Sequence, residues 1–255
     1  MFKLRHYGHG APVAALARSV LFDIVQPESP AIMALPGNAI LAVWNEVDPA
    51  NEDDFNEWYY REHIPERTMV PGLNRGRRYR AEDGSPRYMA FYEAASMEVL
   101  TKGPYRMQLD NPSAWTQRIM PHFRFAQRGL CDVAASVGEG MGGAAAVVHI
   151  KPGDAPRLRT WITETLLHEI HALPDVAAAH LWTLAPGEPR SPTTALSQRA
   201  EPEHPIEWVV VVETMELAGA EAITAAILGR NPKAHGAAEI RPYPSYRLLY
   251  ALDRR

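Results

Sequence analysis

The chain has 255 residues, 46% of them hydrophobic and 22% charged, which is typical of a globular protein with one large domain or two of ordinary size. Its formal net charge of −4 gives no broad electrostatic reason to expect nucleic acid or an anionic membrane as a partner. The single cysteine, Cys131, excludes an intrachain disulfide and a cysteine-based zinc site, and no apolar run approaches the roughly 20 residues that span a bilayer. We therefore expect a cytoplasmic protein with a small-molecule partner, and the sequence leaves a homo-oligomer open.

Residues 1–36 precede the first predicted strand, and we expect them to form an N-terminal extension. Basic residues and an apolar stretch bear a faint likeness to a targeting segment, but Arg18 and Asp23 interrupt any signal-like core and no convincing small-residue cleavage site follows. Two interpretations stay open. Residues 1–32 are either an extension outside the fold or the result of a start assigned too early, with Met33 as the natural start.

The first half of the chain reads strand, helix, strand, strand, helix, strand. Asn51 or Asp53 can cap the first helix, Pro65 is expected to end or kink it, and Asp83-Gly84 is a strong hairpin signal. The predicted elements are a strand at 39–46, a helix from about 52 to 65, strands at 73–80 and 87–93, a helix at 97–109 and a strand at 123–133.

The second half repeats this order at a nearly constant distance along the chain. At an offset of 103, Trp58 falls on Trp161 and Pro71 on Pro174, whereas His63 falls on Leu166. The offset becomes 120 beyond the hairpin, because the second hairpin carries 17 extra residues that read as an exposed loop, and 123 near the ends. The predicted elements are strands at 142–150, 177–184, 207–215 and 246–252 and helices at 155–173 and 219–228.

A βαββαβ unit covers one face of its sheet with two helices and leaves the other face bare. Strands that are apolar on both faces imply that the bare face is buried too, and the second copy can supply the cover. We therefore predict an α+β fold in which two ferredoxin-like βαββαβ repeats form an intrachain pseudo-dimeric α+β barrel. The first repeat covers residues 37–137 and the second 144–255, joined by a flexible glycine-rich linker at 138–143.

The first helix carries an aromatic and histidine stripe, because Phe55, Tyr59 and His63 recur every four residues. The second copy has apolar residues at these positions, which indicates that the stripe faces the core. A satisfied core histidine is the plain interpretation of His63. However, Leu166 in the copy shows that the fold does not require a histidine, and a buried polar group costs free energy unless it is paired.

The strand at 73–80 holds four arginines; in the second copy three of them become neutral, apolar or small residues, and the fourth, Arg77, meets His180. Because side chains alternate along a strand, Arg77 and Tyr79 share one face while Arg78 and Arg80 share the other. Arginine is suited to holding a carboxylate or enolate through two donors. A solvated strand with ion pairs to acidic residues is an equally good interpretation for any single arginine, and the sequence does not decide whether Arg77 or Arg78 faces a pocket.

These residues resemble the EthD-like members of the dimeric α+β barrel superfamily. The likeness rests on the run from Trp58 to Arg67, WYYREHIPER, followed by Val70-Pro71-Gly72 and Gly76-Arg77-Arg78-Tyr79, and it covers roughly residues 38–135. The resemblance implies a ferredoxin-like barrel with a pocket between sheet and helices. It also implies relatives among cofactor-free cyclases, lactone isomerases, dehydratases and oxygenases that act on aromatic or polyketide-like substrates, and fold analogy does not choose among these reactions.

Three functions follow from the same residues. The first is a cofactor-independent enzyme of the lyase, cyclase or isomerase type acting on an aromatic or enolisable carboxylated substrate, with no cofactor and no metal. In it His63 moves a proton, Arg77 or Arg78 holds anionic charge, Tyr79 and Tyr59 orient or polarise an oxygen, and Trp44, Trp58 and Tyr88 wall the cavity. The second is a non-catalytic binding or auxiliary protein for a hydrophobic small molecule in a catabolic pathway. The third, a structural pseudo-dimer, predicts no cavity beside His63.

Overall fold

A computed structural model of the chain describes residues 35–185 and 206–254. Residues 1–34 of the predicted N-terminal extension and nearly all of the predicted loop insertion lie outside the described residues, whereas Leu35 is buried in the core and belongs to the fold. The helices and strands within them follow the order predicted for two βαββαβ units.

The first repeat begins with strand β1 and ends with the long strand β4. Its elements are β1 (Ala39–Val47), η1 (Pro49–Asn51), α1 (Glu52–Trp58), η2 (Tyr59–His63), α2 (Ile64–Thr68), β2 (Leu73–Ala81), β3 (Tyr88–Ala94), α3 (Met97–Thr101), α4 (Gly103–Asp110), α5 (Ala114–Ile119), η3 (Met120–His122) and β4 (Phe123–Gly138).

The second repeat has the same order but divides its last strand into two pieces. Its elements are β5 (Ala144–Pro152), α6 (Ala155–Trp161), η4 (Ile162–Leu166), α7 (Leu167–His171), β6 (Val176–Leu184), β7 (Trp208–Thr214), α9 (Leu217–Gly229), η5 (Pro232–His235), β8 (Ala237–Pro242) and β9 (Tyr246–Asp253).

Both first helices contain a π-helical turn, and the two turns match at the predicted offset. η2 is a π-helix at Tyr59–His63, and η4 is a π-helix at Ile162–Leu166. Pro65 does not end the first helix, because it lies in the first turn of α2, where a missing N–H is tolerated. The second repeat has the same π turn without a proline, so the turn belongs to the repeat and not to Pro65.

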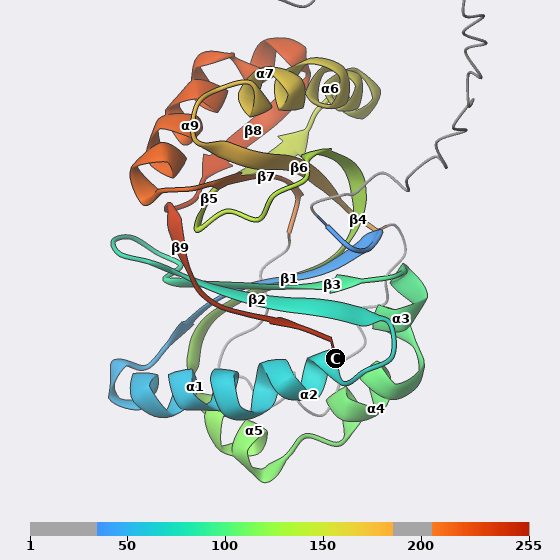
Figure 1. The fold of residues 1–255 in the computed structure, drawn as a ribbon, viewed down its shortest axis with the longest axis vertical. Helices are drawn as coiled ribbons and strands as arrows, with labels where there is room; N and C mark the ends of the chain where they lie inside the picture. Colours follow the sequence, from blue (N-terminus) through green and yellow to red (C-terminus); the bar gives the residue numbers. More distant parts are fainter. Residues whose placement is uncertain (1–34, 186–205, 255) are drawn as a thin grey trace, which may run out of the picture. The chain divides into compact units, whose positions relative to one another are not determined.

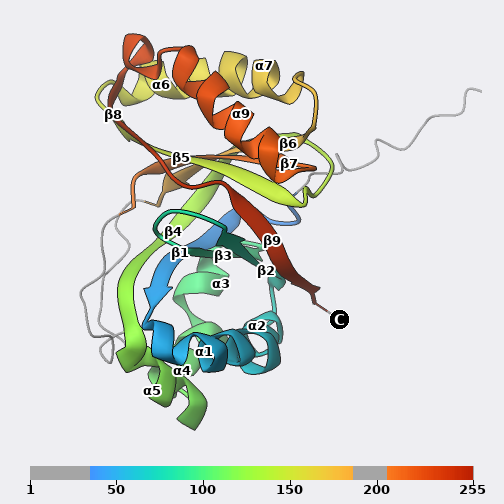
Figure 2. The ribbon, with the colours of Figure 1, turned by 90° about the vertical axis from the view of Figure 1, so that its left-hand side faces the viewer.

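Eight strands of the described residues close into an antiparallel barrel in the order β1–β3–β2–β9–β5–β7–β6–β4, and β8 pairs with β5 outside the ring. The two units exchange their last strands. β4 pairs with β1 of its own repeat and then with β6, whereas β9 pairs with β5 and then with β2. Figures 1 and 2 show β9 leaving the second repeat to lie beside β2 of the first.

Alternation of side chains along these strands divides the core into three clusters. One lies between the sheet and helices of the first repeat, one between the sheet and helices of the second, and the third fills the barrel interior between the two repeats. The helices α1–α5 cover one side of the barrel and α6, α7 and α9 the other (Figure 1). This arrangement confirms the predicted pseudo-dimeric barrel.

The strand registers correct the simple offsets expected at the ends of the repeats. Ala39 of β1 pairs with Ala94 as Ala144 of β5 pairs with Thr214, so these strands correspond at an offset of 105. Strand β9 corresponds to the end of β4 at 115, because Leu252 pairs with Gly76 as Val137 pairs with Ala179. The expected offset of 123 is therefore wrong for the paired residues of this strand.

The glycine-rich segment between the repeats is tied to β7 at Gly142, whereas residues 139–141 and 143 are exposed, and its flexibility stays a prediction. The backbone N–H of Gly142 donates to Oε2 of Glu213 at 2.8 Å. A Cβ atom at Gly142 would lie 2.4 Å from the carbonyl oxygen of Thr214, so only glycine allows this approach.

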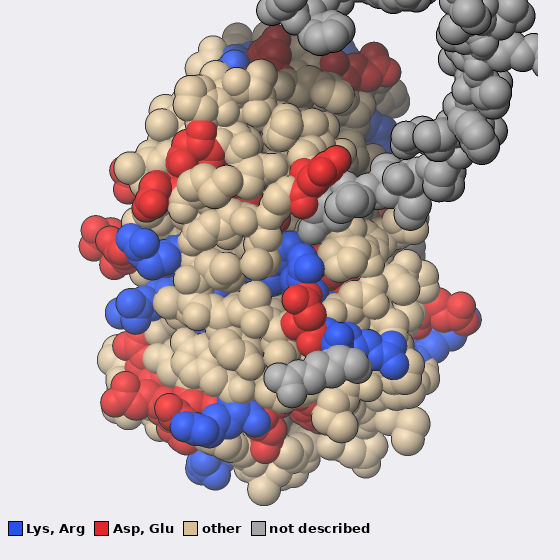
Figure 3. Space-filling view, in the orientation of Figure 1, with Lys and Arg blue, Asp and Glu red and all other residues tan. Residues whose placement is uncertain are grey.

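Surface charges of both signs lie next to each other on the face shown in Figure 3. Ion pairs tie β9 to the first repeat, including Arg75 with Asp253 and Arg247 with Glu82. Exposed pairs of this kind contribute little to stability, so the buried clusters and the ladders hold the fold together.

Candidate active site

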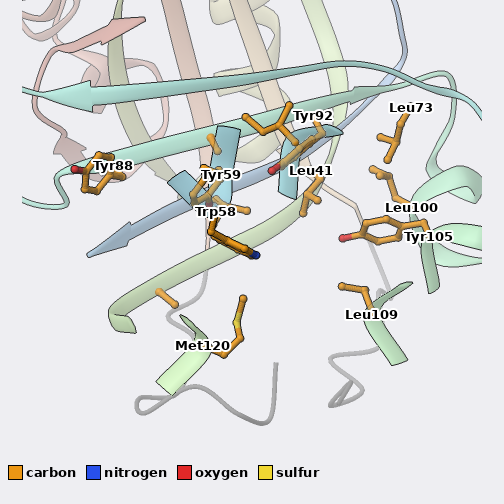
Figure 4. Close-up of a cluster of buried hydrophobic side chains, with 14 of the residues drawn as sticks. Leu41, Trp58, Tyr59, Leu73, Tyr88, Tyr92, Leu100, Tyr105, Leu109 and Met120 are labelled. Atoms are coloured by element: carbon orange, nitrogen blue, oxygen red, sulfur yellow. The ribbon is translucent and has the colours of Figure 1, made fainter. Parts of the chain in front are cut away.

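A small cavity opens beside His63, between the sheet of the first repeat and its helices. Its volume is about 40 Å³, and its lining consists of aliphatic, aromatic and basic residues: Leu41, Val43, Trp58, Tyr59, His63, Arg67, Tyr92, Tyr105, Leu109, Met120, Phe123 and Arg128. Figure 4 shows Tyr59, Leu41 and Tyr92 close to the sheet, with Leu109 and Met120 on the opposite side. The cavity contradicts the third interpretation, which predicted none.

Aromatic rings surround the imidazole of His63. The ring stacks on Trp58 with centroids 4.1 Å apart and meets the edge of Tyr59 at 5.1 Å. Both neighbours are held by hydrogen bonds, because Trp58 Nε1 donates to Thr116 Oγ1 at 3.1 Å and Asn45 Nδ2 donates to the Tyr59 hydroxyl at 3.1 Å. His63 is therefore placed at the cavity wall by neighbours that have little freedom to move.

Two arginines that the sequence did not single out reach the same cavity. Arg67 Nη1 donates to Gln108 Oε1 at 2.6 Å, and the Arg67 guanidinium lies 5.5 Å from the centre of the Tyr105 ring. Arg128 Nη2 donates to the Tyr105 hydroxyl at 3.2 Å. Arg67 follows His63 by four residues and therefore extends the same helical stripe. Comparison of the two repeats along this stripe could have identified it from the sequence. Arg128 lies on a distant strand, and no local pattern points to it.

The hydroxyl group of Tyr92 is the other polar feature that sequence reasoning missed. It lies on β3, is buried and has no hydrogen-bond partner among the described residues. Burial raises the pKa of Tyr92 well above its usual value, so the group is a neutral O–H donor at physiological pH.

Arg78 faces the same side of the sheet as the cavity but lies beside it, in a cage of aromatic rings. Its guanidinium is 3.7 Å from the centre of the Tyr59 ring, 4.6 Å from Tyr88 and 4.7 Å from Phe55. Nη2 donates to Asn56 Oδ1 at 2.7 Å, whereas Nε and Nη1 find no hydrogen-bond partner within 35–185 and 206–254. Burial lowers the pKa of Arg78.

Three of the predicted residues point the other way, into the barrel interior, and do not line this cavity. Arg77 pairs with Glu93 at 2.7 Å and with Glu213 at 2.8 Å, and Tyr79 lies beside it. Trp44 is fully buried in the interior cluster. Alternation along β1 and β2 puts these side chains on the face opposite to His63, which settles the question that the sequence left open between Arg77 and Arg78.

The cavity as it stands is smaller than an aromatic substrate. A water molecule occupies about 30 Å³ of liquid, and an apolar cavity of about 150 Å³ binds benzene. A volume of about 40 Å³ therefore admits a group of the size of a carboxylate but not a ring. The described residues contain no group of three or more His, Cys, Asp or Glu side chains that could hold a metal ion, and no helix among them is long and apolar enough to cross a membrane.

No family model and no curated protein matches the sequence. Solved structures do match it. An anthrone oxidase-like protein has a TM-score of 0.58 at 14% identity, covering 88% of this chain and 96% of its own. A candidate monooxygenase from Lactobacillus acidophilus has a TM-score of 0.54 at 4% identity and covers 85% and 97% of the two chains. A second candidate monooxygenase, from Fusobacterium nucleatum, has a TM-score of 0.52 at 10% identity, covering 86% of this chain and 96% of its own. The chain thus shares the ferredoxin-like α+β barrel fold of these proteins across both repeats.

Proposed function

We propose that the first repeat is the catalytic half of a cofactor-independent enzyme that moves a proton on an aromatic or enolisable carboxylated molecule, as a lyase, cyclase or isomerase does. The observation that carries this proposal is the imidazole of His63 at the wall of a cavity, where the second repeat has Leu166. An imidazole is the side chain best suited to proton transfer near neutral pH.

The resemblance to EthD-like proteins belongs to this proposal, and the shared barrel supports it. Among the solved structures, one is described as anthrone oxidase-like. An anthrone is an aromatic ketone that enolises, which is the kind of carbon acid that a histidine base can deprotonate. Removal of that proton is a first step common to isomerisation, elimination and cyclisation.

The surrounding residues position the imidazole for this step. Trp58 stacks on it and Tyr59 meets its edge, so the imidazole presents a fixed orientation to a bound molecule. Arg78 lies on the ring of Tyr59 and Tyr88 lies on Arg78, so both act as positioning residues. Arg77, Tyr79 and Trp44 take no part in the proposed step, because they face the barrel interior.

Hydrogen exchange at carbon tests the proton step without knowledge of the whole reaction. Enolisable ketones and carboxylic acids, anthrone among them, are incubated with the protein in D₂O, and loss of the C–H signal is followed by NMR. We expect the wild-type protein to accelerate exchange and His63→Leu to lower that rate by about 10²–10⁴-fold, the usual contribution of a positioned acid or base.

His63→Leu copies the second repeat and should keep the fold, which circular dichroism checks. His168→Leu, at a histidine outside the cavity, is the matched control and should leave the exchange rate unchanged. Equal exchange rates for wild-type protein and His63→Leu would show that the histidine moves no proton. Binding of these compounds without accelerated exchange would favour the non-catalytic alternative.

A further inference from the structure

We infer that the cavity beside His63 contains an anion subsite, in which Arg67, Arg128 and the Tyr92 hydroxyl bind the carboxylate of the substrate. This inference rests on the proposed function, since the carboxylate belongs to the molecule on which His63 acts. It names the group that enters the cavity and the residues that recognise it.

The electrostatics of the lining favour an anion. Two guanidinium groups contact the same side chain, because Arg67 lies against the Tyr105 ring and Arg128 donates to its hydroxyl. No Asp or Glu is among the described residues that line the cavity. The carboxylate of Glu66 pairs with Arg67 Nη1 at 3.6 Å from outside the lining, so Arg128 has the larger share of the positive charge offered to an anion. Positively charged groups that are held close together and shielded from water create a positive potential, which attracts an anion.

Within the described residues the Tyr92 hydroxyl has no hydrogen-bond partner, and a bound ligand would supply one. A buried donor without an acceptor destabilises the protein, and a hydrogen bond to a charged group recovers more of that cost than one to a neutral group. Tyr92 lines the cavity, so an oxygen bound there can accept its hydrogen. A carboxylate has two oxygens, enough for the phenol and a guanidinium at once.

The second repeat shows that the fold does not need these polar groups. Ile170 stands at the position of Arg67 at the helical offset of 103. Val212 stands at the position of Tyr92, because it pairs with Ala179 as Tyr92 pairs with Gly76. Pro242 stands at the position of Arg128, because it pairs with Val148 as Arg128 pairs with Val43. Leu166 for His63 completes the set, so all four polar positions are apolar in the copy.

The size of the cavity agrees with a carboxylate as the buried group. A volume of about 40 Å³ is well below the roughly 150 Å³ of a cavity that binds benzene, so a carboxylate fits it better than a ring. The rest of the substrate then lies outside the present cavity or enters after the lining moves, and the acid group supplies the specific contacts.

Binding of matched small probes tests the subsite. Acetate and benzoate are titrated into the full chain and followed by calorimetry and two-dimensional NMR, with benzamide as the neutral analogue of benzoate. We expect saturable binding of the acids and weaker binding of benzamide. Arg128→Gln and Tyr92→Phe should each weaken acid binding about tenfold, as loss of a hydrogen bond to a charged group does.

Tyr92→Phe is the decisive variant, because it removes only a hydroxyl that has no partner among the described residues. Its melting temperature should equal or exceed that of the wild type while acid binding falls. Tyr246→Phe is the control, since its buried hydroxyl donates to the Pro86 carbonyl at 2.8 Å. That change should lower the melting temperature and leave acid binding unchanged. Arg118→Gln, at an exposed arginine outside the cavity, controls for net charge.

Three outcomes would overturn the subsite: no saturable acid binding by the wild type, equal binding of benzoate and benzamide, or full acid binding by both Arg128→Gln and Tyr92→Phe. The proposed function fails separately. If acid binding depends on these residues but His63→Leu still catalyses hydrogen exchange, the subsite stands and the role of His63 does not.

Discussion

The carboxyl group of Glu93 lies in the barrel interior between basic groups of its own repeat and an acidic group of the other. Arg77 is 2.7 Å from it and Arg75 is 3.9 Å away, and Arg77 also pairs with Glu213. Burial raises the pKa of Glu93 to about 7, against the pull of Arg77 and Arg75. Burial also opposes ionisation of Glu213, but the hydrogen bond from His180 and the charge of Arg77 outweigh it, and the pKa of Glu213 is lowered.

These two shifts act on stability in opposite pH ranges. The folded protein keeps the proton of Glu93 up to about pH 7, whereas the unfolded chain releases it near the ordinary value of 4.5. The contribution of Glu93 to the free energy of unfolding is therefore fully present below pH 4.5 and is lost as the pH rises through 7. The contribution of Glu213 is present above pH 4.5 and is lost as the pH falls through its lowered pKa.

Glu93→Gln tests the pH dependence assigned to Glu93, because glutamine keeps the shape and an acceptor for Arg77 but cannot ionise. We expect the free energy of unfolding of the wild type, measured with urea, to be lower at about pH 8 than at about pH 5 by a few kcal/mol. The variant should show a smaller fall. Parallel changes in the two proteins would mean that Glu93 is ionised throughout this range in the folded state.

At the scale of elements, the joint between β4 and β5 decides how the two repeats meet. β4 crosses from β1 to β6, and the chain then turns within a few glycines to enter β5. The turn is held by the Glu213 carboxylate, which accepts from Gly142 N and pairs with Arg77 and His180. A side chain at Gly142 would therefore disturb both the backbone of β7 and the buried ion pairs.

Gly142→Ala should lower the free energy of unfolding by about 1–3 kcal/mol, the usual cost of forcing extra atoms into a packed site. Its Cβ would lie 2.4 Å from the oxygen and 2.7 Å from the nitrogen of Thr214, and backbone atoms cannot turn away. Gly140→Ala is the matched control, because its nearest neighbour would be 3.4 Å away. Equal unfolding curves for the two variants would show that the backbone between β4 and β5 shifts to accommodate the added methyl group.

At the scale of the whole described barrel, the exchanged strands make each repeat depend on the other. β9 covers the edge of β2, and β4 covers the edge of β6. The interior cluster combines side chains from both repeats, such as Phe91 against Trp182 with ring centroids 4.9 Å apart. A repeat on its own would expose this apolar face and an unpaired strand edge, both of which promote aggregation.

The chain should therefore unfold in one cooperative step. Tryptophan fluorescence and far-ultraviolet circular dichroism should give coincident urea transitions. A fragment comprising residues 33–138 should fail to fold, because it lacks β9 and the second half of the interior cluster. Two separate transitions, or a folded fragment, would show that each repeat is a stable unit.

Local patterns account for most of the fold. The π turns at η2 and η4 lie at the offset of 103 that the helices predicted, and the strands that are apolar on both faces are buried on both faces. The stripe of Phe55, Tyr59 and His63 predicted that His63 faces the core beside Tyr59, and the cavity lies there. These features follow from the sequence because helical and strand periodicity act over a few neighbouring residues.

The tertiary structure alone decided that Arg128 and Tyr92 share a cavity with His63. Arg67 is a turn away from it, but Arg128 comes from β4 and Tyr92 from β3, so only the pairing of β1 with both strands brings them together. The register of β2 against β3 and β9 turns Arg77 and Tyr79 inward, and the β4–β6 and β9–β2 pairings place the last strand of each repeat on the other. By itself the sequence determined the repeat, the order of its elements and the half that carries the histidine. Local patterns do not determine the register between strands that are distant in the chain. A shift of that register by one residue would turn every side chain to the opposite face of the sheet.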